Sequence, residues 1–259
     1  MSSWSSRRKL AFILFGFIVL IIFVASIYFL FIYKVPACTD GIMNGTETGV
    51  DCGGSCVKLC QNSFLPPNIV WGGAKFEKVT DELYNVAALI SNQNINGAAT
   101  DVPYRISLYD DRGILIKNRE GKVTLYPHRN SLAFDSAINV GKRVPAKAIF
   151  EFLQAPVWFK SHDALDGIAI INKKYTDDNN SSSLEVTLEN RTLFPYEDIL
   201  VSVVLYDKDG NAIGFSKTII DSIEAKNGRV TAPFTWPIDR KGAVTSIEVI
   251  PIISPTADR

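Results

Sequence analysis

Few residues in this 259-residue chain have the side-chain chemistry of a catalytic centre. Hydrolytic triads need a histidine base beside a nucleophile and an orienting carboxylate, and the sequence contains only two histidines. His128 lies in a Tyr-Pro-His-Arg-Asn turn pattern. His162 stands between Ser161 and Asp163, but neighbours in sequence point in different directions on a strand or loop. With no phosphate-binding glycine loop, G-x-S-x-G or HExxH motif, we predict no catalytic residue and a chain that is not an enzyme.

The four cysteines are concentrated in one short run. Cys38, Cys52, Cys56 and Cys60 follow a C-x13-C-x3-C-x3-C spacing. An even number of cysteines in a small exported segment indicates disulfides, because such a segment cannot build an apolar core of its own. The spacing lacks the C-x2-C pairs typical of zinc ribbons. We therefore predict two disulfides, no metal and no cofactor, and the three possible pairings stay open.

Acidic and amide residues are interleaved with these cysteines. Asp40, Asn44, Glu47 and Asp51 offer the oxygen ligands that calcium binds, but their spacing is not that of an EF-hand loop. Asp, Asn and Gly also favour tight turns. We expect turns here, and a hairpin loop at the acidic run 177–180, with calcium binding as the alternative at both places.

The segment before the cysteines is a candidate membrane span. Residues 10–33, from Leu10 to Tyr33, contain no charge and no proline, and Gly16 and Ser26 are the only small or polar breaks. As a helix these 24 residues would be about 36 Å long, enough for the roughly 30 Å hydrocarbon core of a bilayer. We expect the chain to contact lipid through this segment.

Charge asymmetry predicts the orientation of the span. Arg7, Arg8 and Lys9 precede it directly, whereas Lys34 is the only basic residue close behind it. The positive-inside rule then places residues 1–9 in the cytoplasm and the rest outside, as a single-pass cell-membrane protein. A cleaved signal peptide and a lipidated Cys38 are the alternatives, disfavoured by the length of the apolar stretch and by Pro36.

After residue 65 the sequence contains the same β pattern twice. Val102, Tyr104, Ile106 and Leu108 alternate with polar residues, and adding 97 to their numbers gives Ile199, Val201, Val203 and Leu205. The strand end LYDDRG at 108–113 recurs as LYDKDG at 205–210. By the same comparison, 84–92 matches 184–190 and 146–152 matches 229–236.

A period near 97 residues fits an immunoglobulin-like β-sandwich. The predicted fold class is therefore all-β: a transmembrane helix, a disulfide-rich neck at 34–64, and tandem sandwiches at 65–156 and 157–259. Trp158 and Phe159 are expected either to fill the seam between the sandwiches or to pack in the core of the second one.

Two of these patterns resemble known families. Residues 38–56 resemble a C-x-D-G-x-x-N-G-x-E-x-x-x-D-C-G-G-x-C motif of bacterial and archaeal cell-surface proteins. The Leu-Tyr-Asp strand ends resemble the FxLYD group of bacterial and archaeal immunoglobulin-like domains, with Ile106 and Val203 in place of the phenylalanine. The resemblance implies extracytoplasmic binding or spacer modules.

Composition and motifs together predict a non-catalytic, membrane-anchored surface protein. Equal numbers of acidic and basic residues, 27 of each, argue against nucleic-acid binding. The predicted role is structural, adhesive or partner-binding, with a protein or cell-envelope partner. The alternatives are an accessory subunit of a membrane or envelope export complex and an extracellular hydrolase.

Overall fold

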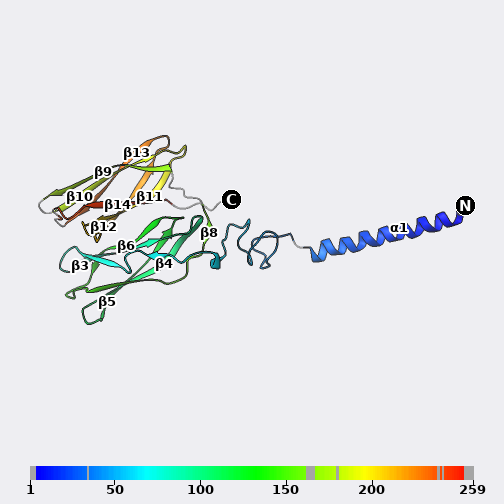
Figure 1. The fold of residues 1–259 in the computed structure, drawn as a ribbon, viewed down its shortest axis with the longest axis horizontal. Coiled ribbons are helices and arrows are strands. Elements are labelled where there is room, and N and C mark those ends of the chain that lie inside the picture. Colours follow the sequence, from blue (N-terminus) through cyan, green and yellow to red (C-terminus); the bar gives the residue numbers. More distant parts are fainter. Residues whose placement is uncertain are drawn as a thin grey trace. The chain divides into compact units, whose positions relative to one another are not determined.

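The computed structural model describes residues 4–33, 35–161, 167–178, 181–237, 240 and 242–253. The chain forms two compact units, an N-terminal unit at 1–54 and a β-rich unit at 55–259 (Figure 1). The sequence predicted a mostly β protein with one N-terminal apolar helix and disulfides, and this much is confirmed.

The N-terminal unit begins with one long helix. Helix α1 spans Trp4–Ile27 and continues as a π-helical turn, η1, at Tyr28–Ile32. Its segment Lys9–Leu30 is long and apolar enough to cross a membrane. Leu10, Gly16 and Ser26 lie on α1, and Tyr33 directly follows η1. The Ser26 hydroxyl donates to the Ile22 carbonyl oxygen at 2.8 Å, so this polar group is satisfied within the helix.

The β-rich unit contains fourteen strands in its described residues and one short 3-10 turn, η2, at Gln61–Ser63. We call β1–β8 the first module and β9–β14 the second module. The first module consists of β1 Asn68–Ile69, β2 Lys75–Lys78, β3 Leu83–Ser91, β4 Gly97–Tyr109, β5 Leu115–Leu125, β6 Asn130–Asn139, β7 Lys147–Phe152 and β8 Phe159–Lys160. The second consists of β9 Ile168–Asp178, β10 Ser181–Asn190, β11 Tyr196–Tyr206, β12 Ala212–Ile223, β13 Gly228–Trp236 and β14 Ser246–Ile252.

Strand pairing is the same in both modules. One antiparallel sheet joins β2, β3 and β6 in the first module and β9, β10 and β13 in the second. The other joins β5, β4 and β7, and correspondingly β12, β11 and β14. The internal repeat seen in the sequence therefore extends to the order and pairing of six strands.

This pairing corrects one sequence match. Residues 146–152 form β7, which pairs with β4, and their counterpart is β14, which pairs with β11. The predicted counterpart, 229–236, forms β13, which instead matches β6. The match was wrong because two short apolar strands resemble each other by alternation alone, and alternation does not tell which neighbour a strand pairs with.

Each module buries its core between its two sheets. The predicted inward face of β4, at Val102, Tyr104, Ile106 and Leu108, is at most 5% exposed. The equivalent face of β11, at Ile199, Val201, Val203 and Leu205, is fully buried. Burial raises the pKa of Tyr104 to about 12, and the nearby carboxylate of Asp135 adds to the shift. The period-two prediction of the core-facing residues is confirmed.

Trp158 lies elsewhere than either expectation placed it. It is 2% exposed in the core of the first module, and its ring stacks on Phe64 with centroids 5.8 Å apart. Strand β8, which includes Phe159, pairs with Gly97 and Ala98 at the start of β4. The first module therefore continues past the boundary predicted at residue 156. Trp158 closes its own module because the segment before β1 returns to cover it, which no local sequence pattern indicates.

A buried asparagine stands at the end of β3 in the first module and of β10 in the second. The side-chain nitrogen of Asn92 donates to the carbonyl oxygens of Gly97 and Tyr126, both at 2.7 Å. Its side-chain oxygen accepts from the Asn94 backbone nitrogen at 3.0 Å. Asn190 repeats the arrangement with Phe194, Ile223 and Thr192. Each amide thus holds the loop after its strand against the end of β5 in the first module or of β12 in the second.

We expect Asn92→Ala or Asn190→Ala to lower the free energy of unfolding by about 1–3 kcal/mol, because buried carbonyl groups would lose their donor. Chemical denaturation of the purified chain measures the effect. Asn118→Ala, at an exposed position on β5, is the matched control and should change stability by less than about 0.5 kcal/mol. Equal effects at all three positions would contradict this role.

The aspartate of each Leu-Tyr-Asp end organises a turn. Asp110 Oδ1 accepts from the backbone nitrogens of Arg112 and Ile114 at 3.0 and 2.8 Å. Asp207 Oδ1 does the same for Asp209 and Asn211, at 2.9 and 2.8 Å. Gly113 and Gly210, with φ of 75° and 78°, occupy the left-handed position that these turns need. The aspartate therefore has a structural role in both modules.

Acid should weaken the second of these turns. The side-chain hydrogen bond from Asn211, followed by backbone hydrogen bonds, holds the pKa of Asp207 below its usual range. The carboxylate therefore adds stability above the pKa of the unfolded group, about 3.9, and this is lost as pH falls through the lower folded value. In Asp207→Asn we expect a shallower fall in melting temperature between about pH 5 and pH 2. An unchanged slope would show that the turn does not depend on the charge.

Candidate functional site: the interface between the two modules

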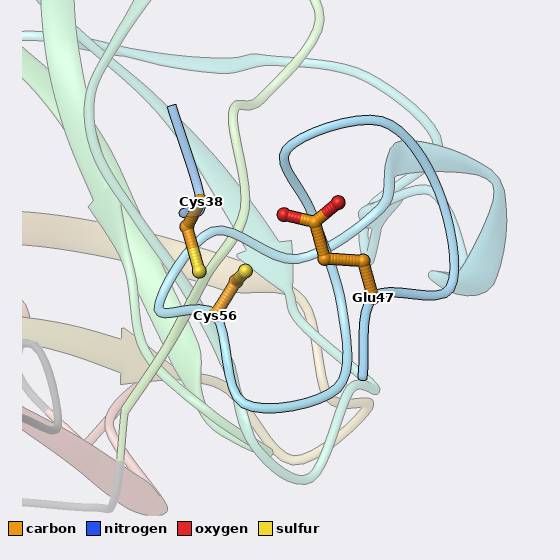
Figure 2. A group of neighbouring side chains, drawn as sticks. All are labelled: Cys38, Glu47 and Cys56. Atoms are coloured by element: carbon orange, nitrogen blue, oxygen red, sulfur yellow. The ribbon is translucent and has the colours of Figure 1, made fainter. Parts of the chain in front are cut away.

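The predicted disulfide residues are confirmed as disulfide-bonded. Cys38, Cys52, Cys56 and Cys60 all take part in disulfides. Figure 2 shows Cys38 and Cys56 together with Glu47. Because a sulfur in a disulfide offers no thiolate, these cysteines are not zinc ligands.

The carboxylates between these cysteines hold turns. Asp51 accepts from the Gly41 backbone nitrogen at 2.9 and 3.1 Å. Asp40 accepts from the Ile42 backbone nitrogen at 2.9 Å and from the Asn44 side chain at 2.8 Å. Glu47 accepts from the Asn44 backbone nitrogen at 3.0 Å. These bonds favour the turn interpretation over the calcium alternative.

Only some of the other candidate residues lie in the described part of the chain. His128 is exposed in a turn with φ of 51°, and its backbone nitrogen donates to the Asn94 carbonyl oxygen at 2.8 Å. His162 and Asp163 lie outside the described residues, as do Asn179 and Asn180 of the acidic run. Lys9 precedes the apolar part of α1 with an exposed side chain, and Arg7 and Arg8 belong to the same helix.

Sequence reasoning missed the contact between the two modules. Ala87 and Leu89 of β3 and Leu132 and Phe134 of β6 point away from the first module's core. They pack against a second-module surface formed by Val204 of β11, Phe215 of β12 and Ile250 of β14. The rings of Phe134 and Trp71 both lie 6.2 Å from that of Phe215, measured between centroids. The outer face of one sheet from each module thus forms a shared apolar layer.

Hydrogen bonds connect the modules around this layer. Glu248 of β14 accepts from the Asn130 side chain at 2.8 Å and from the Tyr206 hydroxyl at 2.7 Å. Burial and this carboxylate raise the pKa of Tyr206, so the hydroxyl remains protonated and donates. Lys217 of β12 donates to the Phe134 carbonyl oxygen at 3.2 Å, and its ammonium lies 5.6 Å from the centre of the Phe134 ring.

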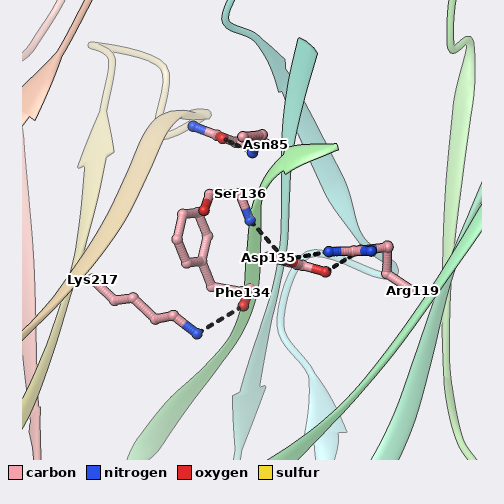
Figure 3. A network of polar contacts seen from close by, with 7 residues as sticks. Asn85, Arg119, Phe134, Asp135, Ser136 and Lys217 are labelled. Carbon is pink, nitrogen blue, oxygen red and sulfur yellow. Dashed lines mark hydrogen bonds and ion pairs between the residues drawn. The ribbon is translucent and has the colours of Figure 1, made fainter. Parts of the chain in front are cut away.

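Figure 3 shows the hydrogen bond from Lys217 to Phe134 beside a polar network within the first module. Arg119 of β5 forms an ion pair with Asp135 of β6, the residue next to Phe134. The same carboxylate accepts from the Ser136 backbone nitrogen at 3.0 Å, as Figure 3 also shows. Strand β6, which accepts the hydrogen bond from Lys217, is therefore also bonded to β5 of its own module.

A buried ion pair crosses the interface. Arg240, between β13 and β14, contacts Glu77 of β2, and their side chains are only 7% and 8% exposed. Arg240 also donates to the Ile213 carbonyl oxygen. A Cβ added to Gly214 would lie 2.9 Å from the guanidinium carbon, so this glycine makes room for the arginine. Burial lowers the pKa of Arg240.

Such a pair contributes more to orientation than to net stability. Removing two charges from water costs about as much free energy as their attraction returns, whereas leaving one of them unpaired is strongly unfavourable. The modules are therefore penalised in any arrangement that separates Glu77 from Arg240. What the interface does physically is fix one relative placement of two repeated modules.

Comparing equivalent positions of the two modules shows where their outer faces differ. Val204 and Phe215 are cross-strand partners at the interface, and the equivalent partners on the first module are Ser107 and Asn118. Where the second module has Ser202, the first has Arg105, which bonds Glu120 and Glu151 on an open face. The sequence did contain a signal for this contact: Val204 and Phe215 are apolar at outward positions where the first module has polar residues.

Comparisons with known proteins do not identify a family. No family model and no curated protein matches the chain. Among solved structures, a β-glucuronidase from glycoside hydrolase family 2 matches at 7% identity and TM-score 0.25, covering 62% of this chain and 20% of its own. Red sea bream transglutaminase matches at 8% identity and TM-score 0.23, covering 70% and 30%. Bacteroides uniformis β-glucuronidase matches at 12% and 0.19, covering 68% and 22%. The chain thus spans at most about a third of these proteins.

Single substitutions at the ion pair should be costly, whereas the double substitution should be mild. We expect Glu77→Leu and Arg240→Met each to lower the free energy of unfolding by about 3–5 kcal/mol, because each leaves a buried charge unpaired. The combined variant should recover most of that loss. Chemical denaturation of all four proteins gives the coupling between the two residues.

The exposed pair Lys78 and Asp81 is the matched control, at 2.8 Å in the same part of the first module. Breaking it should change stability far less than breaking the buried pair, because an exposed ion pair is screened by water and contributes little. If the losses in unfolding free energy from Glu77→Leu and Arg240→Met simply added in the double variant, the buried pair would not be what orients the modules.

Proposed function

We propose that this chain is a single-pass membrane protein that holds its β-rich unit outside the cell membrane, where the unit serves a structural, adhesive or partner-binding purpose. The observation that carries the proposal is the order of features along the chain. An apolar helix of spanning length is followed by four disulfide-bonded cysteines and then by the β-rich unit. Disulfides persist in oxidising compartments, which supports an exterior location for everything after the helix.

The orientation follows from charge. Arg7, Arg8 and Lys9 precede the apolar segment, so the positive-inside rule favours a cytoplasmic N-terminus and an outside C-terminus. The disulfide-bonded segment and the β-rich unit would then both lie outside the membrane.

Each module fits an immunoglobulin-like sandwich. Two antiparallel sheets enclose one apolar core in each copy, with four strands per sheet in the first module and three in the second. Both copies carry the Leu-Tyr-Asp strand end that resembles the FxLYD group. The aspartate in that motif makes a turn, which agrees with a structural motif rather than a reactive one. Modules of this kind support binding surfaces and spacing, and the fold alone defines no ligand.

A second candidate is an accessory subunit of a membrane or envelope export complex. Gly16 and Ser26 favour it, because small residues in a span let a neighbouring helix approach closely. Detergent pull-down separates the two functions. An accessory subunit should retain membrane partners that Gly16→Leu loses, whereas an adhesive protein should bind through its β-rich unit regardless of that substitution.

Protease treatment of intact cells tests the proposed layout. We expect external protease to digest the β-rich unit and leave a short membrane-bound fragment that contains α1, because only the N-terminus is inside. A tag before Trp4 should be protected until the cells are opened, whereas a tag after the last residue should be lost.

The matched control exchanges the flanking charges. Replacing Arg7, Arg8 and Lys9 by glutamine while adding basic residues after Tyr33 should reduce the accessible fraction. A β-rich unit that resists protease in the unaltered protein, or a mature chain that begins after Ala37, would refute the proposed arrangement.

A further inference from the structure

The first module has a counterpart of Arg240, the arginine of the buried ion pair. Arg143 lies in the loop between β6 and β7, and Arg240 lies in the equivalent loop between β13 and β14. The two arginines are 97 residues apart in the sequence, which is the period of the repeat. Arg143 donates to the carbonyl oxygen of Leu115 at the start of β5, at 3.3 Å, and Arg240 donates to that of Ile213 near the start of β12.

The two loops are attached to their modules in the same way. The Ala146 backbone nitrogen donates to the Tyr109 carbonyl oxygen at 2.8 Å, and the Thr245 backbone nitrogen donates to the Tyr206 carbonyl oxygen at 2.9 Å. Each tyrosine is the one that directly precedes the turn aspartate. The repeat therefore places an arginine beside the Leu-Tyr-Asp turn in both modules.

The two arginines differ in what covers them. Arg240 is 7% exposed, receives Glu77 from the other module, and has room because Gly214 lies under its guanidinium. The first module has Lys117 at the position equivalent to Gly214, and Arg143 stays on the surface. Within the described residues Arg143 forms no ion pair, and its hydrogen bond goes to a neutral carbonyl group. A charge that the second module uses in a contact is thus unused in the first.

A pocket lies beside this unused arginine. It has a volume of about 410 Å³, and its lining includes Arg143 and Val144 from the loop and Arg112 from the turn. Val144 is 68% exposed and supplies an apolar wall. Asp110 and Asp111 also line the pocket, but Asp110 is occupied by two backbone nitrogens of its own turn.

The charges around the pocket favour an anionic ligand. Lys142 is exposed next to Arg143, and Lys147 lines an adjoining pocket of about 450 Å³. Together with Arg112 these make four basic residues against the two aspartates of the turn. A guanidinium binds a carboxylate through two parallel hydrogen bonds, and this is the group that Arg240 binds in the second module.

We propose that the Arg143 pocket binds a carboxylate side chain in an acidic segment of a partner protein, as Arg240 binds Glu77 within the chain. A further module of the same kind is the wrong occupant, because the outer face of this sheet carries Arg105 held by two glutamates where the second module has its apolar layer. The proposal rests on the partner-binding role proposed above. It does not depend on how the chain is placed in the membrane.

The test measures binding of a labelled peptide to the full-length chain in detergent micelles, by fluorescence anisotropy with an uncharged dye. The peptide Ser-Phe-Glu-Ser-Val copies residues 75–79 with both lysines replaced by serine, so its acid corresponds to Glu77. We expect saturable binding that weakens about fivefold in Arg143→Gln, and likewise when the peptide carries glutamine instead of glutamate. Lys122→Gln removes an exposed charge near the other end of β5 and should bind like the unaltered chain.

Four results would overturn the proposal. Failure of the unaltered chain to bind the peptide saturably would leave the pocket without this ligand. Equal binding by Arg143→Gln would place the peptide elsewhere on the chain. Galacturonate binding as tightly as the peptide would indicate a site for acidic sugars. Self-association of the chain that Arg143→Gln abolishes, measured by analytical ultracentrifugation, would make a second copy the occupant.

The peptide assay and the protease experiment on intact cells fail separately. A β-rich unit that resists external protease but still binds the peptide refutes the membrane layout alone. A unit that is digested from outside but does not bind the peptide refutes the Arg143 site alone.

Discussion

The apolar layer between the modules is the contact on which the rest of the β-rich unit depends. Phe215 of the second module is covered by Trp71 and Phe134 of the first, and a chain that separated them would expose this layer to water. Apolar packing has little directional preference by itself. The Glu77–Arg240 pair, together with Glu248 and its partners Asn130 and Tyr206, selects one arrangement from those that the apolar surface would permit. Two β modules joined in this way behave as one body.

Sequence reasoning reached the features that depend on local pattern. Alternation predicted the inward faces of β4 and β11, the 97-residue period predicted a repeat, and uncharged length predicted α1. The disulfides followed from cysteine number and compartment. Sequence reasoning failed where two segments that are distant in the chain contact each other. Nothing local to Trp158 indicates that Phe64 covers it, and nothing local to β7 indicates that its counterpart is β14.

The interface was missed for a related reason. Val204 and Phe215 stand at outward positions of strands, where a single sequence does not distinguish an exposed apolar residue from one covered by another module. The signal existed only as a difference between copies: Ser107 and Asn118 occupy the equivalent positions in the first module. Likewise, Arg240 lies outside the described strands, and its partner Glu77 is distant in sequence.

The outer faces of the two modules differ, and this difference determines whether a further module could bind through the same contact. The contact is heterologous, since it joins the β2-β3-β6 side of one module to the β12-β11-β14 side of the other. Contacts of this type build closed rings or open filaments when every copy keeps both surfaces. Here the first module's remaining outer face carries Arg105 between Glu120 and Glu151, and the second module's has Thr187 opposite Thr231. Neither offers an apolar layer to a further copy. The difference between the two modules therefore leaves this contact unable to recruit a third module of either kind.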